Sequence, residues 1–249
     1  MASDYTTGLT SRLRAGTLAQ HAVAEQSGVV AAMVSGTVSS AGYALYLRNL
    51  FPAYAMLEQL ISATPALAAI ARLVRPALCR MPAISLDLDI LVGSHWRRSM
   101  PLLPVARRYA TRVEQAGKGD GNLLVAHAYT RYLGDLSGGQ ILGRLLVQRF
   151  GSDFPLRFTE FPTIKAIAPF ATALRSAIND WGSRLSDELA DLVVREASAA
   201  FELNIELSVE VDRLARGMAD TPWTAGQTWS LSSPPRFSPV NRGSLSPDE

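Results

Sequence analysis

Residues 129–143 read Tyr-Thr-Arg-Tyr-Leu-Gly-Asp-Leu-Ser-Gly-Gly-Gln-Ile-Leu-Gly, with helix-forming segments on both sides and no proline. Each glycine inside a helix costs roughly 0.5–1 kcal/mol relative to alanine, so a helix that keeps four glycines needs a physical reason. Either another helix backbone packs closely against it, or a flat ligand lies directly on the main chain. Asp135 favours the ligand, because an isolated carboxylate is expensive to bury beside a tight helix crossing.

The composition indicates a globular protein. The chain has 249 residues, of which 48% are hydrophobic and 18% charged, with a net charge of +2. This balance and the absence of an arginine- and aromatic-rich run argue against a nucleic-acid partner. The single cysteine, Cys79, excludes an internal disulfide and indicates a reducing compartment. Neither end of the sequence carries an apolar signal or anchor segment, so we expect a soluble, cytoplasmic protein without a membrane anchor.

Apolar residues recur at three- and four-residue spacing, and no alternating Val/Ile/Thr-rich run indicates a strand. The pattern therefore predicts an all-α protein. Residues 76–100 read as irregular, with a possible short helix. The predicted helices span residues 9–33, 40–62, 65–74, 101–116, 120–150, 165–181 and 184–216.

We expect three parts along the chain. Residues 1–8 form a short N-terminal extension, and residues 9–216 form one helical domain. Residues 217–249 are dominated by Ser, Pro, Thr and Gly, so we expect a tail that buries little surface and is disordered.

One of the three histidines has informative surroundings. Arg14, Leu18, His21 and Glu25 share one helix face, so the imidazole has a carboxylate one turn away that can orient it. With no cysteine or second histidine nearby, the pattern argues against zinc. A single axial imidazole suits haem, where the porphyrin supplies the in-plane ligands.

Three blocks of sequence resemble the haem oxygenases. Leu123–Gln140 is similar to the signature of that family, Leu13–Glu25 to its proximal helix, and Ala200–Leu207 to its last core helix. The resemblance covers about residues 9–216. It implies an all-α multi-helix fold with haem sandwiched between a proximal and a distal helix. It also implies oxidative cleavage of haem to biliverdin, with release of iron and carbon monoxide.

The resemblance also implies residue roles. His21 would be the axial iron ligand, and Asp135 would hold a water near the iron and help to deliver protons. The matching positions of the polar network behind Asp135 are Tyr54, Tyr109, Arg131 and Asn204. Further haem-contacting positions are Arg14, Glu25, Tyr129, Gly134, Ser137, Gly138, Gly139, Arg175 and Phe201. Leu18 and Ala171 stand where animal members have lysine. We expect surface or structural roles for His95 and His127.

Two other functions remain open from the sequence. A haem carrier or sensor would keep His21 and the glycines but would have no use for Asp135 and its network. A helical scaffold without a ligand would leave all three features as coincidence. For the enzyme, the sequence contains no Gly-x-Gly-x-x-Gly, flavin or iron–sulfur pattern, so electrons must come from an external donor. A soluble ferredoxin or flavodoxin with its reductase fits a chain without an anchor.

Overall fold

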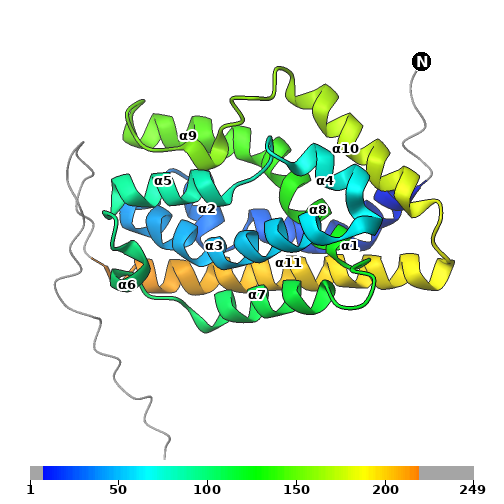
Figure 1. Cartoon of the computed structure of the whole chain (residues 1–249). Coiled ribbons are helices and arrows are strands. Elements are labelled where there is room, and N and C mark those ends of the chain that lie inside the picture. The colour runs from blue at the N-terminus through cyan, green and yellow to red at the C-terminus, as the bar shows by residue number, and fades with distance from the viewer. Residues whose placement is uncertain (1–7, 219–249) are drawn as a thin grey trace, which may run out of the picture.

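The longest helix, α11 (Asp187–Ala215), runs the length of the molecule and organises the fold. In this computed structural model, which describes residues 8–218, helices α1, α2, α3, α7 and α8 all pack against α11. Figure 1 shows α7 and α3 lying alongside it. Residues 8–218 contain no strand, so the prediction of an all-α fold is confirmed.

The remaining elements follow one another with short connections. In chain order they are α1 (Leu9–Glu25), α2 (Gly28–Val34), α3 (Ser40–Ala63), the 3₁₀ turn η1 (Pro65–Leu67), α4 (Ala68–Val74), α5 (Met81–Leu91), α6 (Trp96–Ser99), α7 (Pro104–Ala116), α8 (Leu124–Ala128), the π-helical segments η2 (Tyr129–Leu133) and η3 (Asp135–Gly139), α9 (Gln140–Phe150), the 3₁₀ turn η4 (Arg157–Thr159), and α10 (Ile167–Gly182).

Local sequence signals explain several helix starts. The Ser39 hydroxyl accepts a hydrogen bond from the Gly42 amide at 3.0 Å, and α3 begins at the next residue. The Ser186 hydroxyl caps α11 in the same way, with Asp187 and Glu188 in the first turn, where a negative charge stabilises a helix. Pro104 opens α7, where its missing N–H costs no helical hydrogen bond.

The prediction of one helix over 9–33 is wrong. The chain breaks after Glu25, and α2 begins at Gly28, whose φ is 54°. A Cβ on Gly28 would lie 2.3 Å from the backbone of Ser208 in α11. A glycine with a left-handed backbone is therefore required where the chain turns directly against the long helix.

The prediction of an irregular region over 76–100 is also wrong. It contains α5, an eleven-residue helix that packs against α3. Ile84, Leu88 and Leu91 lie on one face of α5 and are fully buried. Pro82 stands in the first turn, where proline is tolerated, although it weakened the helical signal in the sequence.

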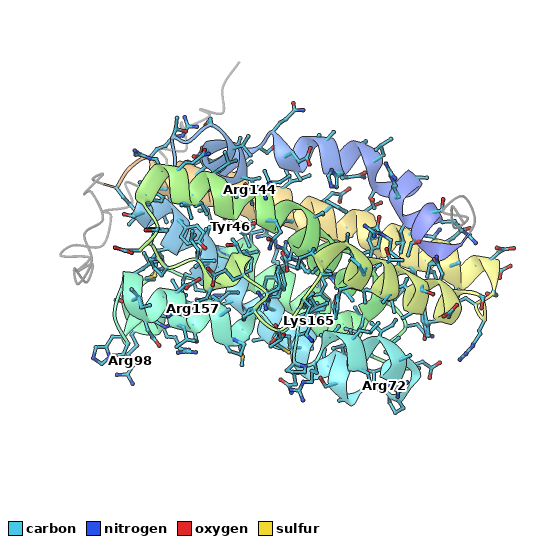
Figure 2. All side chains as sticks on the ribbon, turned by 90° about the horizontal axis from the view of Figure 1, so that it is seen from above. Tyr46, Arg72, Arg98, Arg144, Arg157 and Lys165 are labelled. Atoms are coloured by element: carbon cyan, nitrogen blue, oxygen red, sulfur yellow. The ribbon has the colours of Figure 1, made fainter. Side chains whose placement is uncertain are left out.

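The apolar side chains form one continuous core, and most charged side chains lie outside it. Figure 2 shows Arg72 and Arg98 at the periphery, whereas Tyr46 is buried. Within residues 8–218 no single helix is long and apolar enough to cross a membrane, although α3 and Pro65–Val74 together pass by length and composition across a 93° bend. The expected N-terminal extension and C-terminal tail lie almost wholly outside the described residues.

Candidate functional site

A cavity of about 740 Å³ separates α1 from the π-helical segments η2 and η3. Its volume falls within the roughly 300–1,000 Å³ usual for small-molecule sites. It brings together residues from α1, α2, α3, η2, η3, α9, α10 and α11, and nearly all the positions predicted for a ligand are among them. These are Arg14, His21, Glu25, Tyr129, Arg131, Gly134, Asp135, Ser137, Gly138, Gly139, Arg175, Phe201 and Asn204.

Helix α1 supplies one wall of the cavity. Arg14, Leu18, His21 and Glu25 all line it, as their common helix face predicts. The Nδ1 atom of His21 lies 3.6 Å from Glu25 Oε1, and the ring packs 5.8 Å from that of Phe201. The imidazole is 54% exposed. The structure thus presents a partly open imidazole, oriented by a carboxylate on one nitrogen and facing a large cavity.

The opposite wall has no side chains over much of its area. A Cβ on Gly134, Gly138 or Gly139 would meet nothing within 4 Å, whereas one on Gly143 would lie 2.7 Å from Thr159 Oγ1. The first three glycines therefore face open space, and the fourth serves close packing. The open space at the first three positions leaves room for a flat ligand, whereas Gly143 makes room for the Thr159 side chain.

The wide turns of η2 and η3 lie in the same wall. Residues 129–133 and 135–139 are π-helical, with one residue more per turn than an α-helix. Such turns are rare and occur often at functional sites. They displace the backbone where the glycines face the cavity, and the amino-acid pattern does not predict them.

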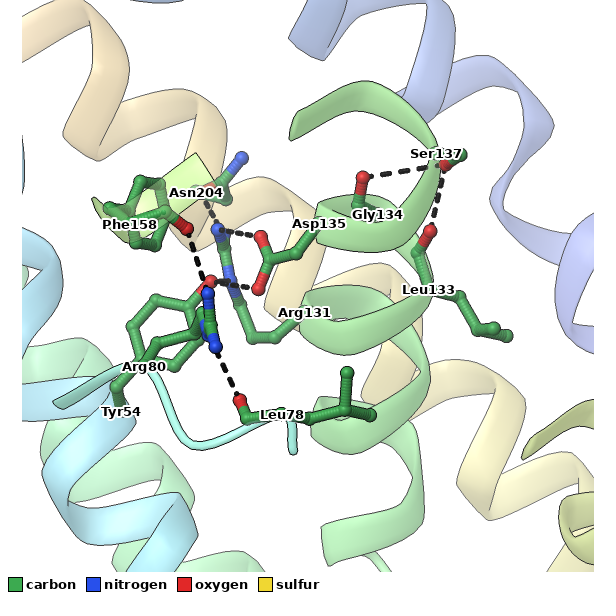
Figure 3. A network of polar contacts seen from close by, with 10 residues as sticks. All are labelled: Tyr54, Leu78, Arg80, Arg131, Leu133, Gly134, Asp135, Ser137, Phe158 and Asn204. Atoms are coloured by element: carbon green, nitrogen blue, oxygen red, sulfur yellow. Dashed lines mark hydrogen bonds and ion pairs between the residues drawn. The ribbon is translucent and has the colours of Figure 1, made fainter. Parts of the chain in front are cut away.

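A buried polar network lies behind this wall (Figure 3). The Tyr54 hydroxyl donates to Asp135 Oδ2 at 2.6 Å and accepts from Arg131 Nε at 3.0 Å. Arg131 Nη1 donates to Asn204 Oδ1 at 2.5 Å, and Arg131 Nη2 lies 3.6 Å from Asp135 Oδ1. Residues separated by up to 150 positions in the sequence thus meet as one connected group.

Burial and pairing compete within this network. Burial raises the pKa of Asp135, although Arg131 and the Tyr54 hydroxyl act in the opposite direction. Burial alone would lower the pKa of Arg131, but the facing phenols and the Asp135 carboxylate raise it well above its ordinary value. Asp135 is therefore easier to protonate than a solvated aspartate, beside an arginine that stays charged.

Tyr109 is placed differently from the other predicted network residues. It is fully buried, and its hydroxyl makes no hydrogen bond to any described residue. Its ring lies 5.9 Å from that of His127. Burial raises its pKa, and the nearby Arg131 guanidinium opposes this rise, so Tyr109 faces the network through Arg131.

Basic residues and a phenol lie together at the α1–α10 side of the cavity. Burial raises the pKa of Tyr129, and the opposing influences come from Thr17, Arg175 and Arg14. All four residues line the cavity. The two cations and the hydroxyl provide groups that can bind carboxylates of a ligand.

The other two histidines lie elsewhere. His127 is fully buried, and its Nε2 lies 3.0 Å from Glu196, which also accepts two hydrogen bonds from Arg112. His95 precedes α6 and does not line the cavity. A second hollow, of about 540 Å³, lies between α7 and α11, beside Arg112. Arg108 and Glu206 form an ion pair there.

Three of the cavity residues that were not predicted from the sequence are instructive. Thr17 follows Arg14 by three positions and precedes His21 by four, so the helix face could have predicted it. Tyr46 lies in the long apolar run of α3, which carries no distinguishing signal. Phe158 is one of two phenylalanines in a loop between two prolines, and only packing shows that it reaches the cavity.

A family model described as "Heme oxygenase" matches residues 7–210. The chain belongs to the haem oxygenase family. It is 33% identical over 205 residues to haem oxygenase 1 of Synechocystis, a match covering 82% of this chain and 85% of the relative. It is 34% identical over 212 residues to human haem oxygenase 1, covering 83% and 72%.

Solved structures of the family share the fold. The crystal structure of haem oxygenase-1 from Synechocystis in complex with haem superposes with a TM-score of 0.78 at 33% identity, covering 85% of this chain and 95% of that one. Haem oxygenase from Leptospira interrogans gives 0.75 at 27% identity, covering 82% and 100%. The resemblance seen in the three sequence blocks therefore extends over the whole helical domain.

Proposed function

We propose that this protein is a haem oxygenase that uses dioxygen and external electrons to cleave haem to biliverdin, releasing iron and carbon monoxide. The observation that carries this proposal is the cavity itself. A glycine wall without side chains faces an imidazole across a space of about 740 Å³. Family membership supports the same reaction.

The residues of the cavity fit haem. Haem is flat, apolar over its faces and anionic at its propionates. The open glycine wall suits a flat face, because no Cβ would obstruct it. Arg14, Arg175 and Tyr129 suit the propionates, and His21 suits the iron as its axial ligand. When bound, haem supplies the redox chemistry of oxygen activation and is also the substrate.

The protein's own residues would orient the His21 imidazole and hold a proton near the bound ring. Glu25 lies near Nδ1 of His21 and would orient the ring by a hydrogen bond to that atom, which would leave Nε2 for the iron. Tyr54 and Arg131 hold the Asp135 carboxylate at the back of the glycine wall. With its raised pKa, Asp135 can hold and exchange a proton there, as expected of an acid–base group.

Asn204 and Tyr109 would support that network, and Ser137, Gly134 and Phe201 would contact the bound ring. Asn204 accepts from Arg131 and so limits its motion. The Ser137 hydroxyl donates to the Leu133 carbonyl, which leaves its oxygen free to accept a hydrogen bond. Phe201 packs against His21 on the other face of the site.

We also infer a cytoplasmic enzyme that receives electrons from a soluble ferredoxin or flavodoxin and its reductase. The sequence contains no nucleotide-binding glycine motif, no flavin pattern and one cysteine only. A donor protein must therefore supply the electrons. Two partly exposed cations at the cavity, Arg14 and Arg175, are compatible with an acidic partner.

The experiment compares His21→Ala with the matched control His95→Ala. Haemin is added to each purified protein, and the visible spectrum is recorded before and after electrons are supplied under air. We expect His21→Ala to lose the native ferric spectrum, added imidazole to restore part of it, and His95→Ala to match the wild type. An unchanged spectrum in His21→Ala would refute the axial assignment. Absence of biliverdin from the wild type with ferredoxin, flavodoxin and a chemical reductant would favour a haem carrier.

A further inference from the structure

The turn around η4 places one aromatic side chain directly beside the polar network. Phe158 lines the cavity, and its ring meets that of Tyr54 edge-on at 5.8 Å. Tyr54 in turn donates to Asp135. The position of Phe158 therefore affects both the shape of the cavity and the support of the Tyr54 hydroxyl.

The buried carboxylate of Asp87, in α5, binds two backbone amides of this turn. Asp87 is fully buried, and its Oδ1 and Oδ2 accept hydrogen bonds from the amides of Arg157 at 3.1 Å and Phe158 at 2.8 Å. Both oxygens are thus used on two successive backbone amides. This arrangement fixes the direction in which the Phe158 side chain leaves the main chain.

The Arg80 side chain binds the backbone carbonyl groups of the same turn. Arg80 Nη1 donates to the Phe158 carbonyl at 3.1 Å and to the Glu160 carbonyl at 2.6 Å. Figure 3 shows this guanidinium beside Tyr54. Its own backbone amide donates to Glu58 Oε1 at 2.5 Å, which anchors Arg80 to α3.

A third contact comes from α9. Gln140 Nε2 donates to the Thr159 carbonyl at 2.9 Å, and Thr159 packs against Gly143, where a Cβ would not fit. The turn is therefore held by α5, by the N-cap residue Arg80 of that helix and by α9 at once. Burial of the charged Asp87 and Arg80 side chains costs free energy, so their presence here indicates that the turn must be fixed in place.

From these contacts we propose that Asp87 and Arg80 are positioning residues that hold Phe158 in the cavity wall and so determine which edge of the haem ring is cleaved. This inference rests on the proposed function. The propionates mark one side of the haem ring, which Arg14, Arg175 and Tyr129 would hold, and contacts of the apolar edges with the wall would refine the rotation of the ring in the cavity. Phe158 is a bulky wall residue next to Tyr54 of the polar network. Its position therefore affects which edge of the bound ring lies nearest to Asp135.

The test compares Asp87→Asn with Glu196→Gln, which alters an equally buried carboxylate far from the turn. An asparagine keeps the shape but has only one accepting oxygen, so one of the two amides loses its acceptor. In haem-free protein, we expect the Arg157 and Phe158 amides to exchange hydrogen about tenfold faster in Asp87→Asn than in wild type, after correction for the change in the free energy of unfolding. In Glu196→Gln, exchange corrected in the same way should stay within about twofold of wild type.

The second measurement is the distribution of biliverdin isomers, separated by chromatography. We expect the minor isomers to rise by about threefold in Asp87→Asn and to stay unchanged in Glu196→Gln. Phe158→Leu should also change the isomers, without faster exchange at Arg157, and it decides the matter if Asp87→Asn does not fold. Unchanged exchange or unchanged isomers in a folded Asp87→Asn would overturn the proposal, as would unchanged isomers in Phe158→Leu. Failure of the wild type to make biliverdin would instead refute the proposed function.

Discussion

Two buried carboxylates pair with arginine in this molecule, and their pKa values shift in opposite directions. Glu196 accepts hydrogen bonds from His127 at 3.0 Å and from Arg112 at 2.7 and 2.5 Å. Burial alone would raise its pKa, but these bonds lower it to about 2. Asp135 accepts one hydrogen bond from Tyr54, with its arginine at 3.6 Å, and burial raises its pKa.

The difference separates a structural carboxylate from one that can take part in chemistry. Glu196 is saturated with donors and stays charged, so it joins α7, α8 and α11 without exchanging protons. Asp135 is incompletely paired and lines the cavity. His127, Arg131 and Asp135 follow at intervals of four, on one face of the same segment. One helix face thus carries both the histidine that pairs with Glu196 and the incompletely paired Asp135.

The largest effect is expected at Asp135, the incompletely paired carboxylate. Asp135→Ala removes the proton-holding group but no iron ligand, so haem affinity should stay within about threefold while biliverdin formed per reduced haem falls roughly 100-fold. The measurement is product yield under identical electron supply, with Glu196→Gln as the control that should keep the wild-type yield. Equal yields from wild type and Asp135→Ala would remove Asp135 from the mechanism.

A smaller effect is expected at Glu196, the fully paired carboxylate. It concerns the stability of the fold and depends on pH. Glu196→Gln should lower the free energy of unfolding at neutral pH by about 2 kcal/mol, because Arg112 and His127 lose a charged acceptor. The pKa of Glu196 is lowered from 4.5 to about 2, so its stabilisation is complete above the unfolded value and is lost as pH falls towards the folded one.

Denaturant unfolding across this range checks the prediction. The difference between wild type and Glu196→Gln should be full at neutral pH and should shrink steadily between about pH 4.5 and pH 2. A difference that stays constant over this interval would show that Glu196 is not held charged by its partners.

The smallest effect is expected at the solvated ion pair on the same two helices. Arg108 and Glu206 bridge α7 and α11 as Arg112 and Glu196 do, but the two side chains are 50% and 46% exposed. Solvated pairs contribute little, so Glu206→Gln should leave the midpoint of thermal unfolding unchanged. A loss as large as that of Glu196→Gln would mean that the geometry of the pair, and not its burial, provides the stability.

The sequence predicted the features that depend on short-range spacing. The face of α1 with Arg14, His21 and Glu25 follows from the helical repeat, and all three residues line the cavity. The glycines of the signature predicted a wall without side chains. The all-α fold and the family are confirmed, whereas the roles of individual site residues remain predictions.

The tertiary structure alone decided how distant segments meet. Gly143 looks like the other signature glycines, yet it packs against Thr159 and does not face the cavity. Asp87 lies in a region that read as irregular, and it holds Phe158 from 71 positions away. Helical periodicity shows which residues share a face of one helix. Which faces then meet depends on packing among all the helices, and no local pattern contains that information.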